Sequence, residues 1–297
     1  MLLNKRIPFY YIFNKIKLEV FYTLIIGFLV FYFTHKFKTV IPEMPIAIPA
    51  FLGTAISVIL SFKLNQSYDR WWEARKIWGS IVNESRSFIL QLQSFVPQEN
   101  APEIKKMAFR HIAWCYSLGQ TLRGQDPAAN LNNHLSEDDL VKINKHNNKP
   151  LAILQLNTLH IAELKNNGLI DIFSQVHINN TLVNFSNAMG MAERIKSTVF
   201  PVTYRYFLHL IIYLFVITLS ISLRDIESHF EIPLLLVISS AFFLLEKTAT
   251  HLQDPFNNKP TDTAMTAIAR TIEINIKQLL HETDIPEAHQ PNNFYLL

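Results

Sequence analysis

The sequence predicts an all-α protein with four membrane-spanning helices and a separate helical part that faces water. Four uncharged runs of about 14 to 19 residues come close to the roughly 20 residues that a helix needs to cross a bilayer. Only 17% of the 297 residues are charged, below the roughly 25% that is typical of soluble domains. The mean hydropathy is nevertheless only slightly positive. We therefore expect a substantial part of the chain outside the bilayer.

The four predicted spans lie in two pairs, one near the amino terminus and one in the last third of the chain. They cover residues 20–34, 44–62, 206–223 and 232–245. The first span is short, but Lys17, His35 and Lys36 at its ends can extend their polar groups toward water. Residues 1–17 before it are basic and aromatic, which is typical of a segment that lies at the membrane interface.

The second span is the element around which we expect the protein to be organised. Thr54, Ser57 and Ser61 interrupt its apolar residues, and hydroxylated residues suit a helix that faces other helices or water rather than lipid. No proline follows Pro49 until Pro97. One helix is therefore predicted to leave the bilayer and continue through a charged, aromatic segment into water.

The remaining helices are predicted from apolar residues that recur every three to four positions without an uncharged stretch long enough to span. They are expected at residues 66–96, 103–123, 150–165, 169–196 and 263–281, with a short helix opened by Ser136. The expected divisions are 1–64 (interfacial segment and two spans), 65–200 (cytosolic helices), 201–250 (two spans) and 251–297 (loop, helix and extended polar tail).

Lysine and arginine residues are enriched on the side of the membrane that holds both termini. That side carries Lys63, Arg70, Arg75, Lys76, Lys196, Arg205 and Lys247, whereas the opposite loops carry Lys36, Lys38 and Arg224. The positive-inside rule then predicts a multi-pass protein of the cell (inner) membrane, with cytoplasmic termini and cytoplasmic soluble helices.

Sequence motifs of enzymes and cofactor sites are absent. There is no Gly-rich phosphate loop, His-Glu-x-x-His or Gly-x-Ser-x-Gly, so we expect no catalytic residue and no cofactor, and a net charge of +3 is too small to indicate nucleic acid. His160 and Glu163 have metal-ligand spacing, but a solvated or capping pair is the preferred interpretation. Glu246 and His251 end the fourth span, where an acid is usually paired; the neighbouring Lys247 offers an ordinary explanation.

Thr54, Val58 and Phe62 are four residues apart, so they stack along one face of the second span. If several copies of the helix surround an axis, this face forms a hydroxyl ring, an aliphatic ring and an aromatic ring. Apolar rings exclude ions by dewetting and act as a constriction. From these residues alone, ordinary helix packing remains the preferred alternative.

Several blocks of the sequence closely resemble bacterial members of the bestrophin family. The most specific is residues 67–79, which contain Arg70, Trp71 and Trp72. Residues 83–86, residues 193–198 with Pro201 and Tyr204, and the run Asp254, Pro255 and Phe256 add to it. Because the blocks extend from the second span to past the fourth, the resemblance covers nearly the whole chain.

The resemblance implies a homopentameric ion channel with four membrane helices per subunit and one pore on the fivefold axis. The second span would line a hydrophobic neck, with layers at Thr54, Val58 and Phe62. Bestrophins usually carry a bulky apolar residue where this chain has Thr54, so two tight rings are expected instead of three. Ile172 matches a cytosolic aperture of the bacterial relatives. The implied partners are further copies of the chain, membrane lipid and permeant monovalent ions.

The resemblance also bears on calcium control and on ion selectivity. In animal bestrophins a run of acids after Pro-Phe binds calcium, but residues 257–262 here contain one acid, Asp262. Calcium prefers six to eight oxygen ligands, so we predict no metal and no calcium control at this loop. Bacterial relatives favour monovalent cations whereas animal members pass anions, so the resemblance favours cations. A secondary transporter, a membrane enzyme and a membrane-anchored scaffold remain alternatives.

Overall fold

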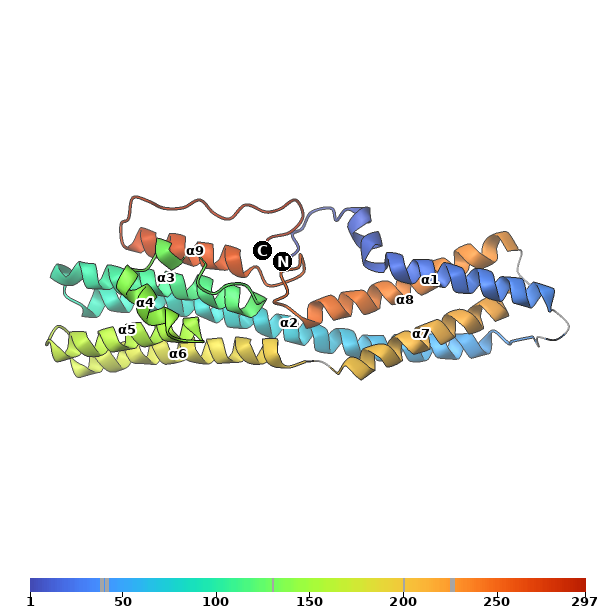
Figure 1. Ribbon diagram of the computed structural model, residues 1–297, viewed down its shortest axis with the longest axis horizontal. Coiled ribbons are helices and arrows are strands. Elements are labelled where there is room, and N and C mark those ends of the chain that lie inside the picture. Colours follow the sequence, from blue (N-terminus) through green and yellow to red (C-terminus); the bar gives the residue numbers. More distant parts are fainter. Residues whose placement is uncertain (38–39, 41–42, 130, 200, 225–227) are drawn as a thin grey trace. The chain divides into compact units, whose positions relative to one another are not determined.

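The computed structural model describes residues 1–297 except 38–39, 41–42, 130, 200 and 225–227 (Figure 1). Its regular elements over the described residues are helices, as predicted. The chain divides into a membrane unit, Asn4–Arg70 with Val199–Asp254, and a bundle unit, Met1–Leu3 with Trp71–Thr198 and Pro255–Leu297. Lys38 and part of the polar loop expected between the last two spans lie outside the described residues.

The membrane unit contains four helices that are long and apolar enough to cross a bilayer. They are α1 (Phe9–Lys36), the first part of α2 (Ala47–Phe95), α7 (Val202–Ser222) and α8 (Ser228–Gln253). All four predicted spans are therefore helical, apart from residues 44–46 before α2 and Leu223 after α7. Residues 9–17 of the segment expected at the interface form the first turns of α1, which begins after Pro8. Their position at the membrane interface stays a prediction.

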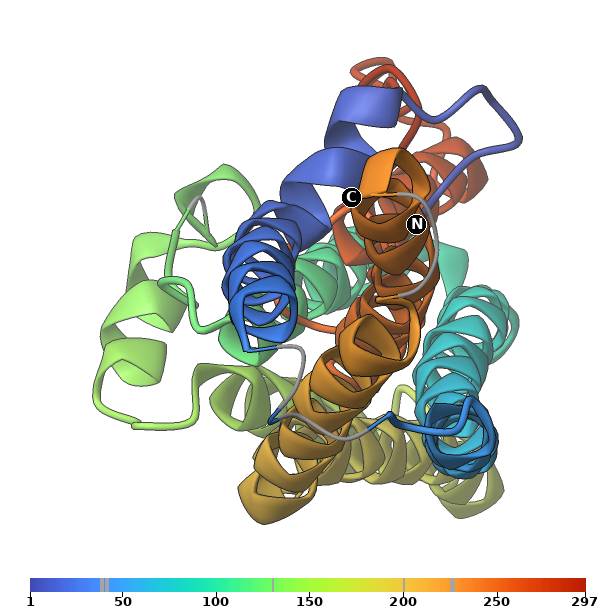
Figure 2. The ribbon, with the colours of Figure 1, turned by 90° about the vertical axis from the view of Figure 1, so that its right-hand side faces the viewer.

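Small residues let the membrane helices approach one another closely. Helices α1, α7 and α8 pack together (Figure 1 and Figure 2). A Cβ at Gly27 of α1 would lie 3.0 Å from Leu235 of α8, and one at Gly53 of α2 would lie 3.2 Å from the ring of Phe215 in α7. A larger residue at either glycine would force its neighbour to move. Ile56 of α2 is fully buried in the same core.

The bundle unit is built around α3 (Ala101–Arg123), which packs against α5, α6 and α9. The other helices are the second part of α2, α4 (Glu137–Asn144), α5 (Lys149–Asn166), α6 (Ile172–Ser197) and α9 (Met265–Leu279), with short 3₁₀ turns at Gln98–Asn100 and Leu131–Asn133. Aromatic rings fill the core, where Trp78, Trp114, Phe88 and Phe185 are fully buried.

Capping residues fix the ends of these helices. Ser136 accepts a hydrogen bond from the amide of Asp139 and begins α4, as predicted. Gly124 has a φ of +68° and ends α3 in the left-handed conformation that glycine favours. The helix expected from residue 169 starts instead at Ile172, because the side chain of Asp171 caps it. The polar tail from residue 284 contains no helix in its described residues.

Candidate functional site

One face of α2 in the membrane unit makes few contacts within the chain. Thr54, Val58 and Phe62 lie on this face, and the side chain of Phe62 is 64% exposed. On the opposite side, Ile56 and Leu60 are buried against α7. The structure thus brings the three predicted neck residues to one exposed face. These side chains do not belong to the core of their own subunit. Only lipid or another chain could therefore cover them.

The hydroxyl groups on this face are satisfied by the helix itself. Thr54 Oγ1 donates to the carbonyl of Ala50 at 2.9 Å, and Ser57 Oγ donates to that of Gly53 at 2.8 Å. Such back-bonding leaves few free donors for water or ions. The face therefore behaves as a predominantly apolar surface from Phe51 to Phe62.

A buried ionic network lies behind the exposed face, at Lys63. Its Nζ donates to Glu246 Oε1 at 2.7 Å and to Thr250 Oγ1 at 2.9 Å, and Thr250 Oγ1 in turn donates to Glu246 Oε1 at 2.8 Å. His209 Nε2 lies 3.2 Å from Glu246 Oε2. Lys63 follows Phe62 directly. The network therefore fixes the rotation of α2 about its own axis at the Phe62 ring of the predicted neck.

The sequence indicated that Glu246 is an acid that needs a partner, but it did not identify Lys63 as that partner. The ordinary explanation, that Lys247 compensates this acid, was wrong: Lys247 Nζ lies 2.5 Å from Glu19 of α1. Lys63 is 183 positions from Glu246 in the sequence, and no spacing rule joins residues that distant. The available indication was a lysine directly after the uncharged run of residues 44–62.

Beyond Phe62 the exposed face of α2 becomes polar. Asn65 and Asp69 are exposed, whereas Lys63 is buried. Asp69 lies seven residues, or about two helical turns, after Phe62 and so shares its face. The first charge that this face presents after the apolar stretch is therefore negative.

The predicted aperture residue, Ile172, lies at the first turn of α6 in the bundle unit. Asp171 caps this turn by accepting from Ser174 N at 2.9 Å and from Ser174 Oγ at 3.0 Å, and these bonds hold the pKa of Asp171 below its ordinary value. Ile172, Phe173 and Val176 are all exposed. The helix start is thus rigidly capped and presents apolar side chains outward.

Residues of the Arg-Trp-Trp and Asp-Pro-Phe blocks make hydrogen bonds and ring contacts within the fold. Trp71 Nε1 donates to the carbonyl of Thr261 at 3.0 Å, and the Trp71 ring lies 6.2 Å from that of Trp72. Phe256 is buried, and the Pro255 carbonyl accepts from the Thr263 amide at 3.1 Å.

The two charged motif residues fall in the membrane unit. There the carboxylate of Asp254 lies close enough to the guanidinium of Arg70 to interact electrostatically. The Arg-Trp-Trp and Asp-Pro-Phe blocks thus each connect segments that are far apart in the sequence.

The loop that would correspond to a calcium clasp has one buried carboxylate. Asp262 Oδ2 accepts from the Lys259 amide at 3.1 Å, and burial raises the pKa of Asp262. The guanidinium of Arg123 also interacts with this carboxylate. One carboxylate that is already bonded to the backbone falls far short of the six to eight oxygen ligands that Ca²⁺ prefers.

His160 and Glu163 do not form a metal site in the described structure. His160 Nε2 lies 2.8 Å from Glu103 Oε2, and its Nδ1 lies 3.1 Å from Nη1 of Arg110. The adjacent guanidinium repels a cation. The described residues contain no group of three or more metal-ligating side chains.

Comparisons with known proteins agree on one family. A family model described as Bacterial/Fungal Bestrophin protein matches residues 10–278. The chain is 31% identical over 288 residues to a protein of Escherichia coli K12 named voltage-dependent anion channel-forming protein YneE, across 96% of this chain and 91% of that protein. A protein of the same name from Salmonella typhi is 33% identical over 247 residues, across 83% and 80%.

Solved structures give the same result. A crystal structure of a bacterial bestrophin homolog from Klebsiella pneumoniae matches with a TM-score of 0.84 and 25% sequence identity, and the match covers 90% of this chain and 99% of that one. The fold and the sequence blocks therefore point to the same relatives.

Proposed function

Since the chain belongs to the bacterial and fungal bestrophin family, we propose that it is the subunit of a homopentameric membrane channel for small monovalent ions. The observation that carries the proposal is the exposed apolar face of α2, with Thr54, Val58 and Phe62 in one row. One subunit with four helices cannot enclose a water-filled path alone, so several copies must meet. Around a common axis, Val58 and Phe62 form the two tight rings of a hydrophobic neck.

A second constriction is proposed at Ile172. Its capped helix start and exposed side chain fit a ring of apolar groups in the water-filled part of the pore. The excess of cations on one side of the spans supports an orientation in the inner membrane with both termini in the cytoplasm.

The proposed selectivity is for cations. An apolar neck carries no formal charge, so the charges beside it decide which ions enter. Asp69 on the exposed face of α2 would provide a ring of carboxylates about two helical turns beyond Phe62, while the charge of Lys63 is neutralised by Glu246. The relatives from Escherichia coli and Salmonella are named for anion channels, so this proposal departs from their names.

The test of the neck is single-channel recording from purified protein in planar bilayers. Phe62→Ala is expected to raise the conductance because it widens the narrowest apolar ring. Phe21→Ala is the matched control, since Phe21 is a similarly exposed phenylalanine on α1. Equal conductance in wild type and Phe62→Ala would reject the neck.

The test of selectivity is the reversal potential in an asymmetric NaCl gradient. We expect a potential near the sodium equilibrium value in wild type and a shift toward zero in Asp69→Asn. A potential near the chloride value would replace the cation channel with an anion channel and leave the neck proposal intact.

The secondary transporter is the second candidate, because the structure brings Lys63, Glu246 and His209 together inside the membrane unit. Transporters use such paired charges next to broken helices. Here α2 and α7 run without a break past these residues. Discrete single-channel currents favour the channel, and their absence together with ion-coupled uptake favours the transporter.

A further inference from the structure

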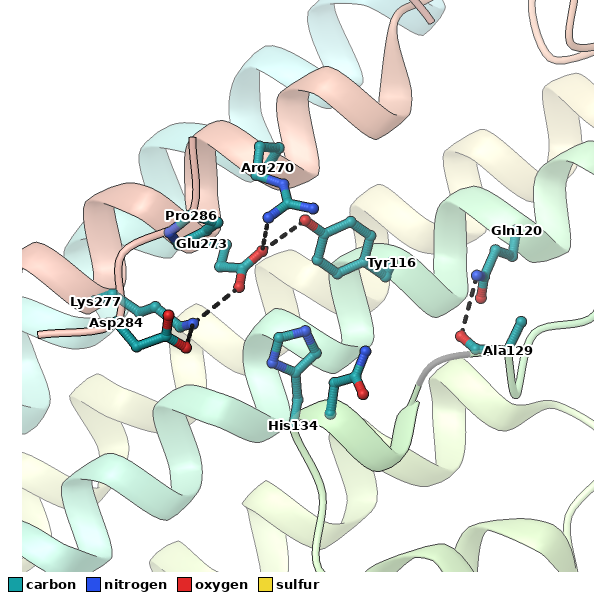
Figure 3. Close-up of a pocket in the computed structure, with 10 residues that line it drawn as sticks. Tyr116, Gln120, Ala129, His134, Arg270, Glu273, Lys277, Asp284 and Pro286 are labelled. Atoms are coloured by element: carbon teal, nitrogen blue, oxygen red, sulfur yellow. Dashed lines mark hydrogen bonds and ion pairs between the residues drawn. The ribbon is translucent and has the colours of Figure 1, made fainter. Parts of the chain in front are cut away.

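A cavity of about 480 Å³ lies in the bundle unit between α3, α9, the turn before α4 and the polar tail (Figure 3). Its volume falls within the roughly 300–1,000 Å³ of small-molecule sites. It involves no residue of the predicted neck or aperture. The channel function therefore gives no reason for its polar lining.

The wall of the cavity holds two cations around one buried carboxylate. Glu273 accepts a hydrogen bond from Tyr116 Oη at 2.7 Å and forms ion pairs with Arg270 at 3.5 Å and Lys277 at 3.2 Å. The side chains of Glu273 and Lys277 are only 4% and 9% exposed, while that of Arg270 is 34% exposed. Two cations thus share one buried carboxylate, and the second carboxylate of the lining, Asp284, belongs to the polar tail.

The tail supplies a loosely held counterion. Asp284 Oδ2 lies 3.6 Å from Lys277 Nζ, although the Asp284 side chain is 99% exposed (Figure 3). An ion pair with one partner in open solvent contributes little. A carboxylate arriving from outside can therefore take its place without breaking a buried contact.

The opposite part of the wall offers hydrogen-bond acceptors. Gln120 Oε1 and His134 Nδ1 are buried without a hydrogen-bond partner among the described residues. The Gln120 amide is oriented by its Nε2, which donates to the Ala129 carbonyl at 3.2 Å. Burial lowers the pKa of His134, so the neutral ring keeps one accepting nitrogen. Buried acceptors without partners are costly, so a ligand whose donor reaches either atom after a small rotation of the side chain is favoured.

Two rings complete the lining. The rings of Tyr116 and His134 are stacked 5.8 Å apart with an interplanar angle of 2°. They give the cavity a flat aromatic wall, against which a planar group can pack.

We propose that this cavity binds a small organic monoanion with a carboxylate, a planar body and a hydrogen-bond donor. The carboxylate binds Arg270 and Lys277 in place of Asp284, the planar body lies along Tyr116 and His134, and the donor reaches Gln120 or His134. The assignment does not depend on the channel function.

The test uses isothermal titration of the full-length protein in nanodiscs with 4-hydroxyphenylacetate as the probe. Phenylacetate lacks the donor, and 4-hydroxyphenylacetamide lacks the charge. We expect the probe to bind, phenylacetate to bind about tenfold more weakly, and the amide not to bind detectably. Arg270→Gln should weaken binding at least about tenfold, because a charge-assisted contact is lost. Arg194→Gln, which removes an exposed arginine of α6, is the control.

The affinity of the Asp284→Asn variant for the probe best distinguishes a competing carboxylate from a structural one. Removing the competing carboxylate should tighten binding, by up to about fivefold, whereas a merely structural role for Asp284 would leave the affinity unchanged or lower it. Absence of binding tighter than about 1 mM would overturn the proposal. So would binding that Arg270→Gln and Arg194→Gln leave equally intact, because the probe would then bind elsewhere.

Discussion

Lys63 and Glu246 form a buried ion pair with 2.7 Å between Nζ and Oε1, and both side chains are 1% exposed. The pair joins α2 to α8 directly behind Phe62. Two charges removed from water stabilise a fold only when they remain paired. The pair therefore specifies which face of α2 is turned outward and which is turned inward.

Breaking this pair should destabilise the protein strongly. Lys63→Met and Glu246→Leu each leave one buried charge without its partner, which costs about 3–5 kcal/mol. The double variant removes both charges and should recover most of the loss. Thermal unfolding of the purified assembly measures all three. Lys76→Met is the matched control, because its pair with Glu73 is exposed and should contribute at most about 1 kcal/mol. A double variant as unstable as the sum of the singles would contradict the pairing.

Thr54 tests whether the neck has two tight rings or three. Its hydroxyl donates to the carbonyl of Ala50. The threonine side chain is also smaller than the bulky apolar residue that bestrophins usually carry at this layer. Thr54→Ile should lower the single-channel conductance because it adds a third apolar ring. Thr54→Val keeps the volume and separates the effect of size from that of polarity. Unchanged conductance in Thr54→Ile would mean that this layer lies outside the narrow part of the pore.

Calcium should not control the protein through the loop after Phe256. Asp262 is its single acid, and its carboxylate already accepts a hydrogen bond from the Lys259 amide. Channel currents are expected to stay constant when free Ca²⁺ is raised to about 10 μM, the upper end of sensor affinities. A calcium response that Asp262→Ala abolishes would refute this prediction.

The sequence predicted the spans and the exposed row on α2 because both depend on local patterns. Uncharged length identifies a span, and a spacing of four places Thr54, Val58 and Phe62 on one face. It did not predict the Lys63–Glu246 pair or the cavity around Glu273. Those depend on which helices meet, and residues such as Tyr116 and Glu273 are 157 positions apart. For the ion pair, the local indication was a charged residue at the end of each uncharged run, and no local pattern indicated the cavity.

The final prediction concerns acid stability and rests on His111 of α3. This histidine is fully buried between Trp114 and Phe185, and its Nε2 lies 2.8 Å from Ser85 Oγ. Because Ser85 Oγ donates to the carbonyl of Ile81, it accepts from a neutral His111. Burial lowers the pKa of His111 to about 3, well below the roughly 6.5 of an unfolded chain.

Between these two values the unfolded chain binds a proton that the folded chain does not. The contribution of His111 to stability is therefore present above pH 6.5 and is lost as the pH falls toward 3, by about 2 kcal/mol between pH 7.5 and 5. His111→Phe keeps an aromatic ring and should remove this part of the pH dependence of thermal unfolding. His146→Asn alters an exposed histidine and should leave the slope as in wild type. If His111→Phe loses stability on acidification as steeply as wild type, another group is responsible for the effect.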